Sequence, residues 1–164
     1  MSFSLFSNNF PDHFIAEQSG DANIIKIVTD IDRADATFDW TGGSLSFGST
    51  GQLRRAVNQI GIVLHIATFA DFRIMGKQFD TISDPAVKEQ VRQESTFIIE
   101  PGLIDPNQLT FRSVAFPNRV IRHKSFQLFA EDVNAPAELQ SATYRRASPL
   151  AQPFAAAAQP QGTY

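Results

Sequence analysis

Residues 109–129 read LTFRSVAFPNRVIRHKSFQLF, in which two apolar segments flank a Phe-Pro-Asn-Arg turn. Apolar and polar residues alternate in these segments, and such alternation is typical of half-buried strands. Pro117 and Asn118 favour a turn between the segments, because proline presets φ and asparagine tolerates the left-handed conformation. The stretch therefore predicts a hairpin, with Arg122 and His123 at the far end of its second strand.

The same pattern occurs in two other parts of the chain. Residues 10–15 read FPDHFI and match the FPNRVI of residues 116–121. A threonine followed by an aromatic residue comes 27 residues after the first phenylalanine of each copy, at Thr37 and Thr143. A looser middle copy has the same pair at Thr96. A unit that recurs three times indicates an internally repeated fold.

Each copy contains about four strand patterns and no pair of long helical patterns. Three such units predict an all-β chain, and the simplest closed arrangement is a β-trefoil with three pseudo-repeats of four strands. A two-sheet sandwich is the alternative. We expect Phe38, Phe97 and Tyr144 at equivalent positions. The predicted β-trefoil domain spans residues 2–149, with units at about 2–43, 44–103 and 104–149, followed by an Ala/Gln/Pro-rich tail or surface arm at 150–164.

Three segments have less regular patterns. Asp84 followed by Pro85 predicts the start of a short helix that runs to Gln93, because aspartate caps helices and proline suits their first turn. Residues 52–60 carry apolar residues at helical spacing, so a short helix is one interpretation of that segment. Residues 30–35 are acidic, and we expect them to form a loop.

The composition argues against several classes of protein. A net charge of −3 and a pI near 5.5 do not fit a surface for nucleic acid or for an anionic membrane. The absence of cysteine excludes a disulfide scaffold and a Cys-ligated metal, and the three histidines are not at metal-ligand spacing. The chain has no hydrolase or nucleotide-binding motif, so we expect no cofactor.

The sequence also bears on targeting. No apolar run is long enough to span a bilayer. The first ten residues, MSFSLFSNNF, lack the basic segment and the continuous apolar core of a signal peptide. We therefore expect a protein that is cytoplasmic or exported by a non-classical route.

Three segments resemble a known family. Residues 112–128 (RSVAFPNRVIRHKSFQL), 33–38 (RADATF) and 95–103 (STFIIEPGL) closely resemble the C-terminal domain of arabinofuranosidase B, a family 42 carbohydrate-binding module. The resemblance covers about residues 2–149. It implies a β-trefoil with up to three pockets, each of which binds an arabinofuranose side chain of a hemicellulose. In this family, each pocket uses a histidine and an aspartate.

The resemblance places two residues in each pocket of units one and three. In unit one, Glu17 occupies the histidine position and Asp35 the aspartate position. In unit three, these positions hold His123 and Ser141, at the same separation of 18 residues. A carboxylate accepts hydrogen bonds from sugar hydroxyls, and a neutral histidine donates or accepts one. The two carboxylates of unit one would face each other and repel.

Unit two has its acid position at Glu94. Its histidine position is His65 or, in another register, Phe69, because insertions lengthen this unit. Units one and three keep the better-preserved framework and are the first candidates for binding. The full set of candidate sugar-binding residues is Glu17, Asp35, His65, Glu94, His123 and Ser141.

These observations favour a carbohydrate-binding, lectin-like module rather than an enzyme, since no catalytic carboxylate pair stands out. The expected partner is an arabinose-containing glycan. One alternative is a protein-interaction or structural β-trefoil with degenerate sugar pockets. Another is an accessory domain that works beside a catalytic subunit encoded elsewhere.

Overall fold

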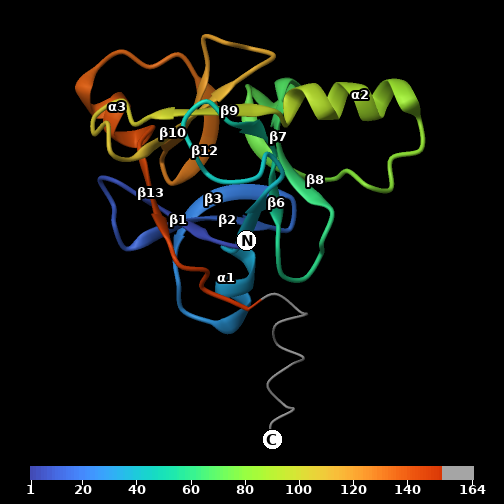
Figure 1. The fold of residues 1–164 in the computed structure, drawn as a ribbon, viewed down its shortest axis with the longest axis horizontal. Helices are drawn as coiled ribbons and strands as arrows, with labels where there is room; N and C mark the ends of the chain where they lie inside the picture. Colours follow the sequence, from blue (N-terminus) through green and yellow to red (C-terminus); the bar gives the residue numbers. More distant parts are fainter. Residues whose placement is uncertain (153–164) are drawn as a thin grey trace, which may run out of the picture.

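Short strands dominate the fold. The computed structural model describes residues 1–152, and this part of the chain forms thirteen strands in one hydrogen-bonded sheet together with three α-helices (Figure 1). The strands are β1 (Ser4–Ser7), β2 (His13–Gln18), β3 (Asp21–Lys26), β4 (Phe38–Trp40), β5 (Thr50–Gly51), β6 (Leu53–Arg55), β7 (Ile62–Ala67), β8 (Arg73–Gln78), β9 (Phe97–Pro101), β10 (Leu109–Ser113), β11 (Val120–Lys124), β12 (Gln127–Glu131) and β13 (Tyr144–Ala147). The helices are α1 (Asp30–Asp35), α2 (Pro85–Glu94) and α3 (Pro136–Ser141).

The first strand of each unit pairs with the last strand of the unit before it. β6 pairs with β4, β10 with β9, and β1 with β13, and the last pairing joins the two ends of the chain. Phe38, Phe97 and Tyr144 lie at the same place in these three ladders and are all fully buried. The expectation that these aromatic residues are equivalent is therefore confirmed.

The second and third strands of each unit form a hairpin, and the three hairpins meet around a pseudo-threefold axis. β3, β8 and β12 pair with one another through one residue pair at each contact, which are Asp21–Met75, Arg73–Phe129 and Gln127–Asn23. This cyclic arrangement is that of a β-trefoil, so the predicted all-β fold is confirmed and the sandwich alternative is wrong. The two-residue strand β5 is the one addition to the twelve strands that we expected.

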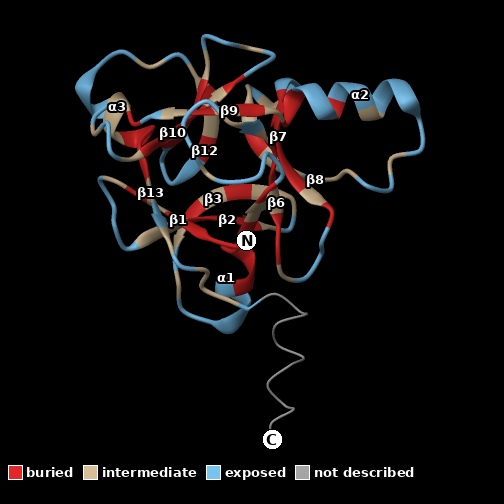
Figure 2. Ribbon diagram, in the orientation of Figure 1, coloured by how far each residue is buried: buried red, intermediate tan, exposed pale blue. Residues whose placement is uncertain are grey.

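The core lies where the barrel strands and the hairpins meet (Figure 2). Phenylalanine, isoleucine and leucine side chains fill it, because each strand turns alternate residues inward. The largest fully buried side chains are Tyr144, Phe3, Phe38, Phe97, Phe111, Leu5, Ile15, Ile24, Leu53, Leu64, Ile66 and Ile74.

The helices are short and precede the last strand of each unit. α2 begins as predicted, because the Asp84 side chain accepts a hydrogen bond from the Ala86 backbone at 2.9 Å. Residues 30–35 form α1 rather than the expected loop. Thr29 and Asp32 make a capping box, which satisfies the first backbone N–H groups of this helix.

Residues 52–60 form the strand β6 and a turn, so the helical interpretation of this segment is wrong. Leu53 is buried against the core and pairs with Trp40, whereas Ile60 is 62% exposed. The helical spacing of the apolar residues therefore does not mark one buried face.

The start of the predicted tail contacts the barrel. The backbone N–H of Leu150 donates to Ser4 Oγ at 3.2 Å, and that of Ala151 donates to Thr37 Oγ1 at 3.1 Å. The rest of the tail, residues 153–164, lies outside the described residues. Within residues 1–152, no helix has the length and apolar character needed to cross a membrane.

Candidate functional site

Strand register identifies the equivalent position in each unit. The cyclic pairing of β3, β8 and β12 aligns Ala22 with Ile74 and Leu128. The residues that pair with these three across each hairpin are Glu17, Ile66 and His123, respectively. Ile66 thus takes the histidine position of unit two, where the sequence analysis left His65 and Phe69 open.

His65 is one residue away from that position and therefore points to the other face of its strand. The register aligns His65 with Arg122 of unit three. The turn between β7 and β8, at residues 68–72, is longer than the two-residue turns of the other hairpins. The spacing of the sequence therefore does not reveal this alignment.

Each pocket obtains its second residue from the end of a helix. Asp35, Glu94 and Ser141 are the last residues of α1, α2 and α3, and all three are buried. The helix ends therefore bring the predicted acid positions next to the hairpins. These residues lie in the same structural place in each unit, but their contacts differ.

In unit three, the predicted residues line a cavity of about 300 Å³. His123 Nε2 lies 2.8 Å from Ser7 Oγ and 3.1 Å from Asn9 Oδ1, so unit one closes one side of this pocket. Ser141 Oγ donates to the Glu138 backbone carbonyl at 2.7 Å. The lining residues are Asn9, Phe10, Arg122, His123, Lys124, Ser125, Phe126, Ala137 and Ser141.

Aromatic rings form one wall of this cavity. The Phe10 and Phe126 rings meet edge to face with centroids 5.3 Å apart. The His13 ring stacks on Phe126 at 4.9 Å, and the Phe10 ring contacts His123 at 5.6 Å. This wall is fixed by packing and presents apolar surface beside the polar groups.

Burial and the nearby positive charge of Arg122 keep His123 neutral at neutral pH. Burial, with the positive charge of Arg122 as the next cause, lowers the pKa of His123 to about 4. Arg122 donates to Ser141 Oγ at 3.1 Å through Nε and to Glu131 at 2.9 Å through Nη1. Burial raises the pKa of Glu131, but hydrogen bonds from Lys124 and Arg122 outweigh it and lower that pKa.

In unit one, an arginine fills the space between the two predicted carboxylates. Arg55 Nη1 donates to Glu17 Oε1 at 2.8 Å, and Nη2 donates to Asp35 Oδ1 at 2.6 Å. The side chains of Arg55 and Glu17 are 2% and 1% exposed. The expectation that these carboxylates repel each other across an open pocket is wrong, because the guanidinium neutralises part of their charge. These contacts favour unit three over unit one.

A glycine leaves room for the Glu17 side chain. A Cβ at Gly76 would lie 2.5 Å from Glu17 Oε2 and 2.6 Å from its Cγ. We expect Gly76→Ala to lower the free energy of unfolding by about 1–3 kcal/mol, because the buried Glu17 cannot move without losing Arg55. Chemical denaturation measures this loss. The adjacent exposed change Lys77→Ala should stay within about 0.5 kcal/mol of the wild type, and equal effects of the two changes would contradict the clash.

In unit two, His65 and Glu94 contact each other directly. His65 Nδ1 lies 3.1 Å from Glu94 Oε1, and Gln90 donates to the other carboxylate oxygen at 3.2 Å. Burial lowers the pKa of His65, although the Glu94 carboxylate opposes this effect. Phe72 and Phe116 pack edge to face with ring centroids 5.6 Å apart, and they correspond in strand position and sequence repeat to Phe126 and Phe10 of the unit-three wall.

A comparison with known families is consistent with this geometry. Residues 65–161 match the model of the alpha-L-arabinofuranosidase B (ABFB) domain. The chain belongs to this family. No curated protein matches the AbfB domain described here.

Solved structures share the fold of this AbfB domain. An arabinofuranosidase complexed with arabinofuranosyl-alpha-1,2-xylobiose superposes with a TM-score of 0.72 at 16% identity, over 92% of this chain and 31% of that chain. A BEL beta-trefoil gives 0.63 at 13% identity, over 90% and 92% of the two chains. A Polyporus squamosus lectin gives 0.63 at 10% identity, over 88% and 48%. The chain thus spans about a third of the length of the arabinofuranosidase.

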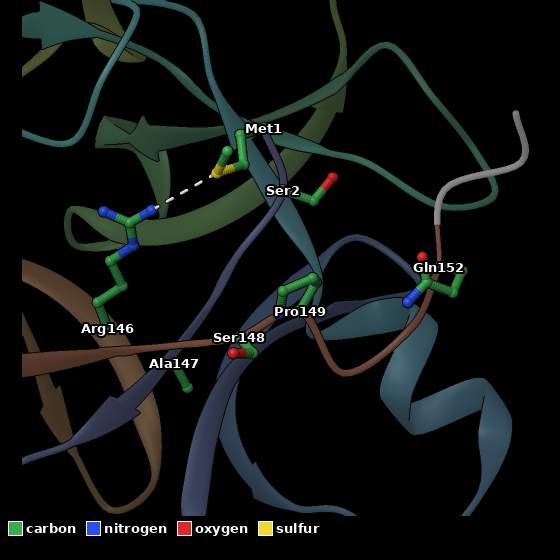
Figure 3. Close-up of a pocket in the computed structure, with 7 residues that line it drawn as sticks. All are labelled: Met1, Ser2, Arg146, Ala147, Ser148, Pro149 and Gln152. Carbon is green, nitrogen blue, oxygen red and sulfur yellow. Dashed lines mark hydrogen bonds between the residues drawn. The ribbon is translucent and has the colours of Figure 1, made fainter. Parts of the chain in front are cut away.

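A second cavity of the AbfB domain lies away from the candidate residues. It has a volume of about 580 Å³ and is lined by residues at both ends of the described chain (Figure 3). Arg146 is the one charged side chain in its lining and donates to Met1 Sδ at 3.9 Å. None of the six predicted residues lines it. Within residues 1–152, no group of three or more potential ligands is arranged to hold a metal ion.

Sequence reasoning missed the residues that neighbouring units contribute. Arg55 belongs to unit two but binds the unit-one carboxylates, and Ser7 and Asn9 of unit one contact His123 of unit three. Pairs inside one unit can be found by their constant spacing. Contacts between units follow from barrel closure, which no local spacing reveals. An alignment of the three first strands would have marked Arg55, because the other units have serine there.

Proposed function

We propose that this AbfB domain binds carbohydrate and that the unit-three pocket is its working site. The observation that carries this proposal is the cavity of about 300 Å³ in which His123 and Ser141 face a wall made by Phe10 and Phe126. This volume lies at the small end of ligand pockets, which suits a single sugar residue.

The polar groups of the pocket suit sugar hydroxyls. Ser141 Oγ donates its hydrogen to Glu138 and keeps acceptor capacity for a sugar hydroxyl, and the neutral His123 ring can donate or accept one hydrogen bond. Arg122 adds a charged donor, and hydrogen bonds to charged groups are stronger than neutral ones. The Phe126 ring offers an apolar surface for the C–H face of a sugar. Few polar contacts face a well-hydrated ligand, so we expect a Kd on the order of millimolar.

Arabinofuranose side chains of hemicellulose are the proposed ligand. Membership of the AbfB family and the similarity to an arabinofuranosidase solved with arabinofuranosyl-alpha-1,2-xylobiose support this choice. We propose binding without hydrolysis, because the pocket contains no carboxylate in its lining that could act as a general acid. Unit two is a secondary candidate through His65 and Glu94, whereas Arg55 occupies the space between Glu17 and Asp35 in unit one.

The mutations His123→Ala and Ser141→Ala test the proposal. Each removes a group that can hydrogen-bond the sugar, so we expect affinity for an arabinose-decorated xylan to fall about tenfold in each variant. Phe126→Ala removes the apolar wall and should have a similar effect. Isothermal titration or affinity electrophoresis measures the loss, with undecorated xylan as the ligand control.

Phe69→Ala is the matched control, because this phenylalanine follows the equivalent strand of unit two and is 84% exposed. It should retain the affinity of the wild type. Unchanged binding in the His123→Ala/Ser141→Ala double variant would exclude the unit-three pocket. Absence of binding to any glycan by the folded wild type would favour the alternative of a protein-interaction or structural trefoil.

A further inference from the structure

Arg55 replaces a residue that is serine in the other two units. The strand pairings Phe38–Arg55, Phe97–Ser113 and Tyr144–Ser7 place Arg55, Ser113 and Ser7 at equivalent positions. In unit three, Ser7 contacts His123 and leaves a cavity beside it. In unit one, the longer arginine side chain extends to the residue equivalent to His123, which is Glu17.

The two terminal nitrogens of Arg55 make four hydrogen bonds in this space. In addition to the two carboxylates, its Nη1 donates to the Glu17 backbone carbonyl at 2.9 Å, and its Nη2 to the Val57 carbonyl at 3.3 Å. The remaining carboxylate oxygens accept from Gly20 N at 2.7 Å and from Gln18 Nε2 at 3.0 Å. Arg55 Nε is buried and has no partner among the described residues. The surrounding groups therefore form a polar site, called here the cradle, that satisfies the two terminal nitrogens of the guanidinium but not its Nε.

Three departures from the other units combine at this place. Glu17 replaces the histidine of unit three, Arg55 replaces a serine, and Gly76 replaces Ala130, its equivalent in unit three. Each change depends on the others. Glu17 needs the space above Gly76, and the buried carboxylates need the positive charge of Arg55.

We infer that Arg55 is a built-in occupant of the unit-one pocket, which excludes external ligands there and leaves a cradle specific for a guanidinium cation. The inference concerns unit one alone. If the Arg55 side chain is removed, the space between Glu17 and Asp35 becomes empty. We expect these buried carboxylates then to bind a small guanidinium ion from solution. Sugar binding in unit three is not needed for this result.

Arg55→Ser tests the inference, because serine is the residue at both equivalent positions. Two buried carboxylates then lose their counter-charge, so we expect Tm to fall on the order of 10 °C. Ethylguanidinium at millimolar concentration should raise the Tm of this variant by a few degrees, since a ligand that binds the folded state stabilises it. Ethylammonium at the same concentration is the matched probe, because it carries the charge without the planar fork of donors.

Arg54→Ser is the control variant. Arg54 lies on the same strand but pairs at the surface with Asp80, so its loss should change Tm little and ethylguanidinium should have no effect. If Arg55→Ser is unfolded, recovery of its circular dichroism signal with ethylguanidinium would support the inference, and failure to recover would overturn it. Equal Tm shifts with ethylguanidinium in the wild type and in Arg55→Ser would also overturn it. Glycan affinity, measured separately with the His123 variants, reports on the unit-three proposal alone.

Discussion

Replacement of Phe97 by alanine is expected to lower the free energy of unfolding by about 3–5 kcal/mol. The Phe97 ring is fully buried in the core cluster, and its strand β9 pairs with β10 along five residues. Truncation removes apolar surface from the core and leaves a cavity that a closed barrel cannot easily collapse. The effect should equal that of a change at Phe38, because the two residues are structurally equivalent.

Urea denaturation followed by tryptophan fluorescence measures this loss, since Trp40 lies in the same core. Phe47→Ala is the matched control. Its ring is 52% exposed, so we expect a change within about 0.5 kcal/mol. A loss below about 1 kcal/mol for Phe97→Ala would show that the three aromatic positions do not hold the units together.

The fold could be predicted from the sequence because its decisive signals are local and repeated. The hairpin at residues 109–129 follows from the alternation of apolar and polar residues and from one turn. The similar sequence at residues 10–15 indicates a repeat. Short elements were harder to predict. The helix α1 has six residues, which is too few to show a helical period. Its local signals are the capping pair Thr29 and Asp32 and the acidic first turn.

The candidate site was less predictable, because its contacts join different units. The constant separation within units one and three predicted pairs of residues that lie at equivalent places in the structure. That spacing could not show that Arg55 fills the unit-one pocket, because this arginine belongs to unit two. In unit two, the turn between β7 and β8 has three more residues than the equivalent turns, so spacing alone did not fix the register, and His65 lies one residue before the expected position.

Acidification from pH 7 to pH 4 is expected to destabilise the protein through its buried histidines. The pKa of His123 is lowered from 6.5 to about 4 by burial and by Arg122. Between these two values, the unfolded chain binds a proton that the folded protein excludes. Stability rises with pH wherever the unfolded state binds more protons, so it must fall as the pH decreases through this window. The full separation corresponds to about 3 kcal/mol, and His65 acts in the same direction.

His123→Gln separates this effect from the titration of carboxylates. Glutamine keeps hydrogen-bonding groups near Ser7 and Asn9 but does not titrate, so the slope of unfolding free energy against pH between 6.5 and 4 should become smaller. Carboxylates whose pKa is lowered, such as Glu131, contribute at the acid end of the range and should be unaffected by the change. Denaturation curves at half-unit pH steps provide the measurement. Parallel pH profiles for the wild type and His123→Gln would show that the buried ring is not the group that the folded state keeps neutral.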